Sequence, residues 1–184
     1  RLSSPLWLVL AALVIAAVTL VGPSERTRGG NLRLVILHGA WVWTGKVAFA
    51  TAALTGLVGL IIPKRVWQNA SLALGRTGLV LWLTYLPMSL LVQQLNWGGI
   101  FWDEPRWRVP FTLGVVALLL QLALWVMKSP RLTCAANLIF GAVLWWQLGG
   151  ITNVLHPDSP IAGSGSTAIQ LNFVILLGLS LLAA

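Results

Sequence analysis

The chain has 184 residues, of which 58% are hydrophobic and only 9% are charged, whereas about 25% of the residues of a typical soluble domain are charged. Its mean hydropathy is +0.86. A soluble domain of this size could not bury so many apolar side chains, and a disordered chain would be poor in them. The composition therefore indicates an integral membrane protein.

The charge balance is basic, with 12 Lys and Arg against 4 Asp and Glu and a net charge of +8. The basic residues stand one to three at a time between apolar runs, so they form no continuous basic face. We interpret them as anchors that meet the headgroups of a lipid bilayer, and we expect no nucleic-acid partner. Cys134 is the single cysteine, which excludes an internal disulfide and a CxxCH site for covalent haem attachment.

Six apolar runs follow one another along the chain. They cover residues 5–21, 32–62, 66–95, 109–127, 132–148 and 168–184. A bilayer core of about 30 Å needs roughly 20 apolar residues per helix, and none of the runs has the alternation of a barrel strand. The sequence predicts an all-α fold: one domain over residues 1–184, built as an integral membrane bundle of six transmembrane helices.

Alternate loops of such a bundle share a membrane face, so the first, third and fifth loops are expected to lie together. That face would hold all four acidic residues of the chain: Glu25, Asp103, Glu104 and Asp158. The other face would have only two short basic turns, at residues 64–65 and 128–131. Short basic turns are typical of the cytoplasmic side, although counting the basic residues does not decide the orientation. We therefore expect a multi-pass protein of a bacterial plasma (inner) membrane, with its functional loops on the external, periplasmic side.

The two histidines, His38 and His156, are both predicted at this loop-rich boundary. A neutral imidazole is a good iron ligand, and two of them from separate segments could hold a haem iron between them. The alternative is that each histidine separately caps a helix end or bonds to a loop.

The third loop, expected over residues 96–108, has the sequence NWGGIFWDEPRWR and contains three of the 11 tryptophans. Tryptophan at a membrane boundary is usually an interfacial anchor, but an aromatic belt requires neither Gly-Gly nor Asp-Glu-Pro. Aromatic planes with glycine clearance would suit a flat, apolar macrocycle. Arg106 and Arg108 would suit its carboxylates, because guanidinium pairs with carboxylate bidentately.

Three stretches of the chain resemble, in order, a known family. They are the segment GNLRLVILH at 30–38, the frame from Trp97-Gly98 to Trp102-Asp103, and Trp145-Trp146 followed by NVLH at 153–156. The family is that of the haem-handling membrane proteins of cytochrome c biogenesis, CcmC and CcsA, to which CcmF is related. The six-helix layout of CcmC is similar as well, so the resemblance covers most of the chain.

The resemblance implies a haem-binding and haem-delivery protein without catalytic turnover, which holds haem b at the external face. His38 and His156 would be the axial metal ligands. The rest of the cofactor site would be formed by Trp97, Gly98, Trp102, Asp103 and Arg106. The implied partner is a CcmE-like haem chaperone or the apocytochrome c itself.

This sequence has Gly99-Ile100-Phe101 where the family commonly has a tryptophan pair. The alternative function is therefore an integral structural subunit of a respiratory or photosynthetic complex. In that case the Trp-rich loop would contact other membrane subunits, a pigment or a quinone. The fifth loop, expected over residues 151–167, contains Gly and Ser and permits movement. Lys46, inside the second run, is expected to face a polar bundle interior, and Arg76 to reach the side of the short turns.

Overall fold

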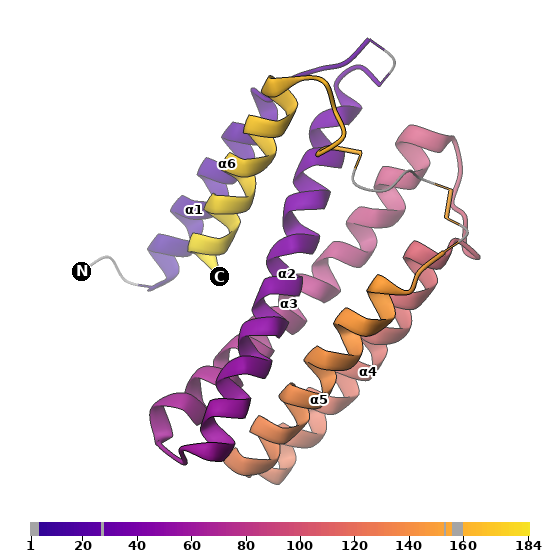
Figure 1. The fold of residues 1–184 in the computed structure, drawn as a ribbon. Helices are drawn as coiled ribbons and strands as arrows, with labels where there is room; N and C mark the ends of the chain where they lie inside the picture. The colour runs from indigo at the N-terminus through magenta and orange to yellow at the C-terminus, as the bar shows by residue number, and fades with distance from the viewer. Residues whose placement is uncertain (1–3, 27, 153, 156–159) are drawn as a thin grey trace. The chain divides into compact units, whose positions relative to one another are not determined.

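A computed structural model describes residues 4–26, 28–152, 154–155 and 160–184. The regular structure of these residues is helical, apart from one antiparallel bridge between Glu25 and Gly29. The helices are α1 (Ser4–Leu20), α2 (Asn31–Ile61), α3 (Arg65–Trp97), α4 (Pro105–Met127), α5 (Pro130–Gly149) and α6 (Thr167–Ala183), as drawn in Figure 1. The prediction of an all-α fold is confirmed for this part of the chain, and each of the six apolar runs forms a helix.

The largest difference from the sequence prediction is the start of α4, at Pro105 rather than at residue 109. Glu104 is the N-cap, and one of its carboxylate oxygens accepts a hydrogen bond from the backbone N–H of Arg106 at 3.5 Å. Proline suits the first position of a helix, since its missing N–H would have no partner there. Because Trp97 also still belongs to α3, the third connection covers residues 98–104, a shorter stretch than the predicted 96–108.

Four helices, α2 to α5, are long and apolar enough to cross a membrane, which makes this a multi-pass membrane protein. The other two, α1 and α6, are apolar but have 17 residues each. A helix of that length spans about 25 Å, somewhat less than the bilayer core of about 30 Å.

The chain forms two compact units, whose boundaries fall within α2 and α3. Unit 1 contains α1, the first part of α2 up to Thr44, residues 88–100 and α6. Helices α1 and α6 lie side by side (Figure 1), and they share an apolar core with α2. The fully buried members of that core are Ile36, Ala40 and Leu176. A hydrogen bond joins the connection between α1 and α2 to α2 itself: Nε of Arg33 donates to the carbonyl of Gly22 at 2.8 Å.

Unit 2 contains residues 45–87 and 101–155, that is, the rest of α2 and α3 together with α4 and α5. Its core is aromatic: the ring of Phe49 meets those of Trp82 and Phe140 edge to face, at centroid distances of 5.9 and 4.9 Å. Small residues allow the close approach, since a Cβ added to Gly78 would lie 2.9 Å from the Phe49 ring. Such contacts are typical of helices packed within a membrane, where small residues let backbones come together.

A buried polar network joins all four helices of unit 2. The side-chain amide of Asn137 on α5 donates to the carbonyl and to Oγ of Ser71 on α3, at 2.8 and 3.1 Å. The Ser71 hydroxyl donates to the carbonyl of Ala52 on α2 at 2.9 Å, and Gln121 on α4 donates to Oδ1 of Asn137 at 2.9 Å. In the absence of water each such bond fixes the register of one helix against the next.

Candidate functional site

The residues predicted to form the site are divided between the two units. His38, Trp97 and Gly98 belong to unit 1, whereas Trp102, Asp103 and Arg106 belong to unit 2. His156 lies outside the described residues.

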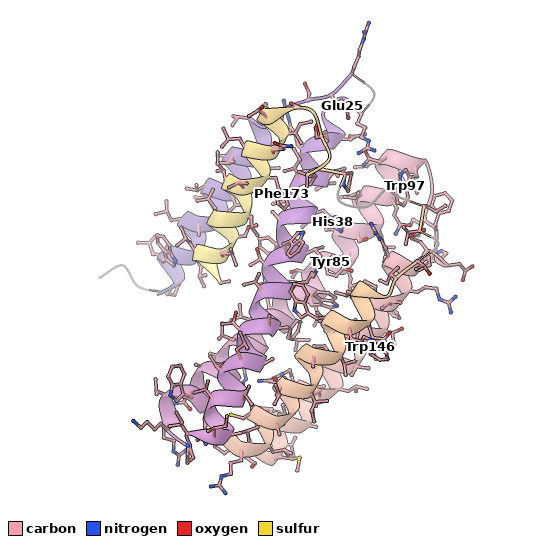
Figure 2. The ribbon with its side chains drawn as sticks, viewed as in Figure 1. Glu25, His38, Tyr85, Trp97, Trp146 and Phe173 are labelled. Carbon is pink, nitrogen blue, oxygen red and sulfur yellow. The ribbon has the colours of Figure 1, made fainter. Side chains whose placement is uncertain are left out.

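His38 lies on the first part of α2, seven residues after Asn31 and so about 10 Å along the helix axis. Its side chain is half-buried, and Nε2 is shielded from solvent. Figure 2 shows the side chain on the first part of α2. The neighbouring Gly39 packs closely against α6 and the segment before it: an added Cβ would lie 3.1 Å from Ile161 and 3.4 Å from Phe173. The imidazole is therefore carried by a well-packed stretch of helix, which suits a ligand held in one orientation.

Trp97 is the last residue of α3 (Figure 2) and is half-buried, and Gly98 directly follows it. Gly98 has φ +72°, and its N–H donates to the carbonyl of Gln94 at 3.2 Å. A glycine in this left-handed conformation is the usual way to end a helix. No atom lies within 4 Å of a Cβ added there, so the space beside this glycine is open, and its left-handed backbone conformation alone favours glycine.

Aromatic side chains form a row at the start of α4. The rings of Trp102 and Trp107 meet edge to face with centroids 5.1 Å apart, and Trp107 stacks on Phe111 at 5.0 Å with planes only 13° apart. Trp102 is 56% exposed, while Trp107 is 8% exposed. The indole N–H of Trp107 is buried and has no hydrogen-bond partner among the described residues. A buried donor without a partner costs on the order of 1–3 kcal/mol, so it is a candidate contact for a bound group.

Glu104 connects this aromatic row to the segment after α5, although the sequence did not single it out as a site residue. It is 4% exposed, and while one oxygen caps α4, the other accepts a hydrogen bond from the backbone N–H of Leu155 at 3.1 Å. Leu155 directly precedes His156 in the sequence. The signal in the sequence was Pro105, because proline is over-represented at the first position of a helix.

The charged side chains of the site differ in their partners. Arg108 pairs with Asp103 at 3.3 Å, but the two side chains are 64% and 97% exposed, so this ion pair contributes little to stability. Arg106 lies close enough to Lys46 for the two positive charges to interact. Lys46 Nζ in turn lies 4.5 Å from the ring centroid of Trp145, a favourable cation–π arrangement.

Within unit 2, Trp102 contacts Trp107, and Arg106 is near enough to Lys46 for their charges to interact. Lys46 and Trp107 were not among the predicted site residues. The arrangement offers aromatic faces, a buried N–H donor and two cations, which suits a flat molecule with acidic groups. No group of three or more His, Cys, Asp or Glu that could hold a metal ion occurs among the described residues.

No family model matches the sequence, and no curated protein is significantly similar to it.

Proposed function

We propose that this chain binds haem b at the external face of a bacterial plasma membrane and delivers it for cytochrome c maturation, in the manner of the CcmC and CcsA family that its sequence resembles. All six helices would span the membrane. His38 and His156 would be the axial ligands, and the Trp-rich loop would form the platform for the macrocycle, as the resemblance implies. The protein would bind and release haem without catalytic turnover.

The observation that carries the proposal is the hydrogen bond from Leu155 N–H to Glu104 at 3.1 Å, across 51 residues of sequence. This hydrogen bond links Leu155, the residue before His156, to Glu104, which is the N-cap of the helix that carries Trp107. The resemblance to the family requires its last histidine segment and its tryptophan loop to cooperate. A buried carboxylate joining the two segments is what such cooperation needs.

The described side chains fit the chemistry of haem. Iron in haem accepts imidazole nitrogen at its two axial positions, and His38 supplies one such nitrogen from a rigid helix. Arg106, with Lys46 nearby, would pair with the propionates, since guanidinium binds carboxylate bidentately. Trp107 would donate its buried N–H, and the stacked Phe111 would exclude water from the ring. Arg108 is less suited to this role because its side chain is 64% exposed, and solvent screens an exposed charge.

Delivery requires that the bound haem be reachable from outside the membrane. Trp102 is 56% exposed and lies next to Trp107 in the connection between α3 and α4. A CcmE-like chaperone or an apocytochrome c would approach along this exposed aromatic edge.

The test is a pyridine haemochrome assay on gently purified protein, made in a host with ample haem. We expect a b-type spectrum and about one haem per chain in the wild type. A matched protein with Trp102→Ala and Trp107→Ala should contain much less haem while still inserting into the membrane. If the wild type contains no haem and co-purifies with a large respiratory or photosynthetic complex, the chain is a structural subunit and the proposal is wrong.

A further inference from the structure

A pocket opens in unit 2, beside the short connection between α4 and α5 and far from the aromatic row. Its volume is about 310 Å³. One wall is the first half of α3, including Gln68 and Arg76, and the other is formed by the end of α4 and the start of α5, including Lys128 and Thr133. Nothing in the haem proposal uses these residues.

The polar part of the pocket suits an anion. Arg76 and Lys128 supply two positive charges, and none of the residues that line the pocket is acidic. The acidic residues described in unit 2, Asp103 and Glu104, precede α4 and so lie about 35 Å from Lys128 along this helix. Neutral hydrogen-bonding side chains complete the polar lining: Gln68, Asn69, Ser129 and Thr133.

The remaining lining is apolar. Leu124 is 4% exposed, and Trp125, next to it on α4, is 64% exposed. On a helix that crosses a membrane, an exposed tryptophan beside a basic residue at the helix end is typical of the headgroup level. The pocket therefore offers cations and hydrogen-bond donors at its polar end and a surface for acyl chains beside them.

The connection between the helices holds Lys128 in one position. Lys128 adopts φ 49°, and its N–H bonds to the carbonyl of Leu124 at 3.1 Å. Ser129 then caps α5, accepting from the N–H of Leu132 at 3.4 Å. Residues other than glycine rarely adopt the left-handed backbone conformation. The residue that adopts it here is a lysine, whose side chain is positively charged. The start of α5 adds a partial positive charge to the same end of the pocket.

We propose that this pocket binds the headgroup of an anionic phospholipid, with the phosphate between Arg76 and Lys128 and the acyl chains along Trp125. Basic pockets between transmembrane helices recognise anionic headgroups in this way. Free phosphate shares the charge of the ligand but would gain nothing from Leu124 and Trp125. The lipid would hold α3 to the α4–α5 pair at the boundary where the turns are shortest.

The test compares lipid binding by the full chain and by two variants with equal charge changes. The first variant combines Arg76→Gln with Lys128→Asn, since asparagine tolerates the left-handed conformation. The second combines Lys64→Gln with Arg65→Gln, two basic residues of the α2–α3 turn that do not line the pocket. Each protein is placed in phosphatidylcholine nanodiscs containing increasing phosphatidylglycerol, and the phosphatidylglycerol retained after detergent extraction is counted by native mass spectrometry.

We expect the wild type and the Lys64/Arg65 variant to retain one phosphatidylglycerol in preference to phosphatidylcholine. The Arg76/Lys128 variant should bind it about thirtyfold more weakly, because each basic side chain near an anionic headgroup contributes about fivefold in affinity. Inorganic phosphate at 10-fold excess over the lipid should not displace it. Equal retention by the two variants, no preference over phosphatidylcholine, or displacement by phosphate would each overturn the assignment. If the Arg76/Lys128 variant does not fold, Arg76→Gln alone should show a loss of about fivefold, and an unchanged affinity overturns the proposal equally.

Discussion

The backbone N–H of Leu155 donates a hydrogen bond to Oε2 of Glu104 at 3.1 Å, although the two residues are 51 positions apart in the chain. The same carboxylate caps α4 through its other oxygen. A buried, charged acceptor forms stronger hydrogen bonds than a neutral one, so this one side chain fixes both the start of α4 and the end of the described segment after α5.

Replacing Glu104 by Ala should release the segment at Leu155. The variant loses the cap of α4 and leaves the N–H of Leu155 without its acceptor, which should lower the free energy of unfolding by about 2 kcal/mol. Hydrogen exchange measured by mass spectrometry should show faster exchange at residues 154–155 and in the first turn of α4. Glu104→Gln, which keeps one oxygen, should have a smaller effect. Unchanged exchange at Leu155 in the Ala variant would contradict the proposed link.

Asn137 should be the most sensitive residue of the polar network. Asn137→Ala removes its bonds to Ser71 and Gln121, and bonds between transmembrane helices contribute about 0.6 kcal/mol each on average. With the cost of the groups left unpaired, we expect a loss of about 2 kcal/mol in reversible unfolding by mixed micelles. The control is Gln147→Ala, on the same helix but exposed, which should change stability by less than about 0.5 kcal/mol.

Two glycines should respond in opposite ways to the same change. A Cβ at Gly141 would lie 2.7 Å from Cβ of Ala53 and 3.0 Å from the carbonyl of Phe49, so Gly141→Ala should force α5 away from α2 and cost about 1–3 kcal/mol. Gly178, in α6, has no atom within 4 Å of an added Cβ. Gly178→Ala should therefore leave stability unchanged or raise it by up to about 1 kcal/mol. Thermal unfolding of both variants in the same detergent measures the difference, and similar losses in both would contradict the packing described here.

The two arginines at the start of α4 should differ in their effect on haem binding. Arg106→Gln should weaken haem affinity by about tenfold, since it removes a cation proposed to pair with a propionate. Arg108→Gln should have little effect, because the Arg108 side chain is 64% exposed and solvent screens its charge. Haem titrations followed by the Soret band measure both affinities. Equal losses in the two variants would indicate a general effect of charge rather than a specific contact.

The helices could be predicted from sequence because each is a continuous apolar run bounded by polar or turn residues. The second run was predicted to cover 32–62, and α2 covers Asn31–Ile61. The start of α4 was placed four residues too late, because Arg106 and Arg108 are not apolar and the cap formed by Glu104 was overlooked. Hydropathy detects what is buried in lipid, whereas a helix start depends on capping side chains.

The arrangement of the candidate site was less accessible to sequence reasoning. The bond from Leu155 to Glu104 and the bond from Asn137 to Ser71 join residues 51 and 66 positions apart, and such contacts depend on how helices pack rather than on local pattern. The proximity of Lys46 to Trp145 and Arg106 arises in the same way. The roles proposed for His38 and His156 stay predictions.

The most direct test of haem binding is the optical spectrum of His38→Gly and His156→Gly, each recorded with and without added imidazole. If the histidines are axial ligands, each variant should lose most of the b-type absorbance of the wild type, and imidazole at millimolar concentration should restore it by occupying the vacated position. Haem binding that is undiminished in both variants would show that neither imidazole binds the iron, and would contradict the account.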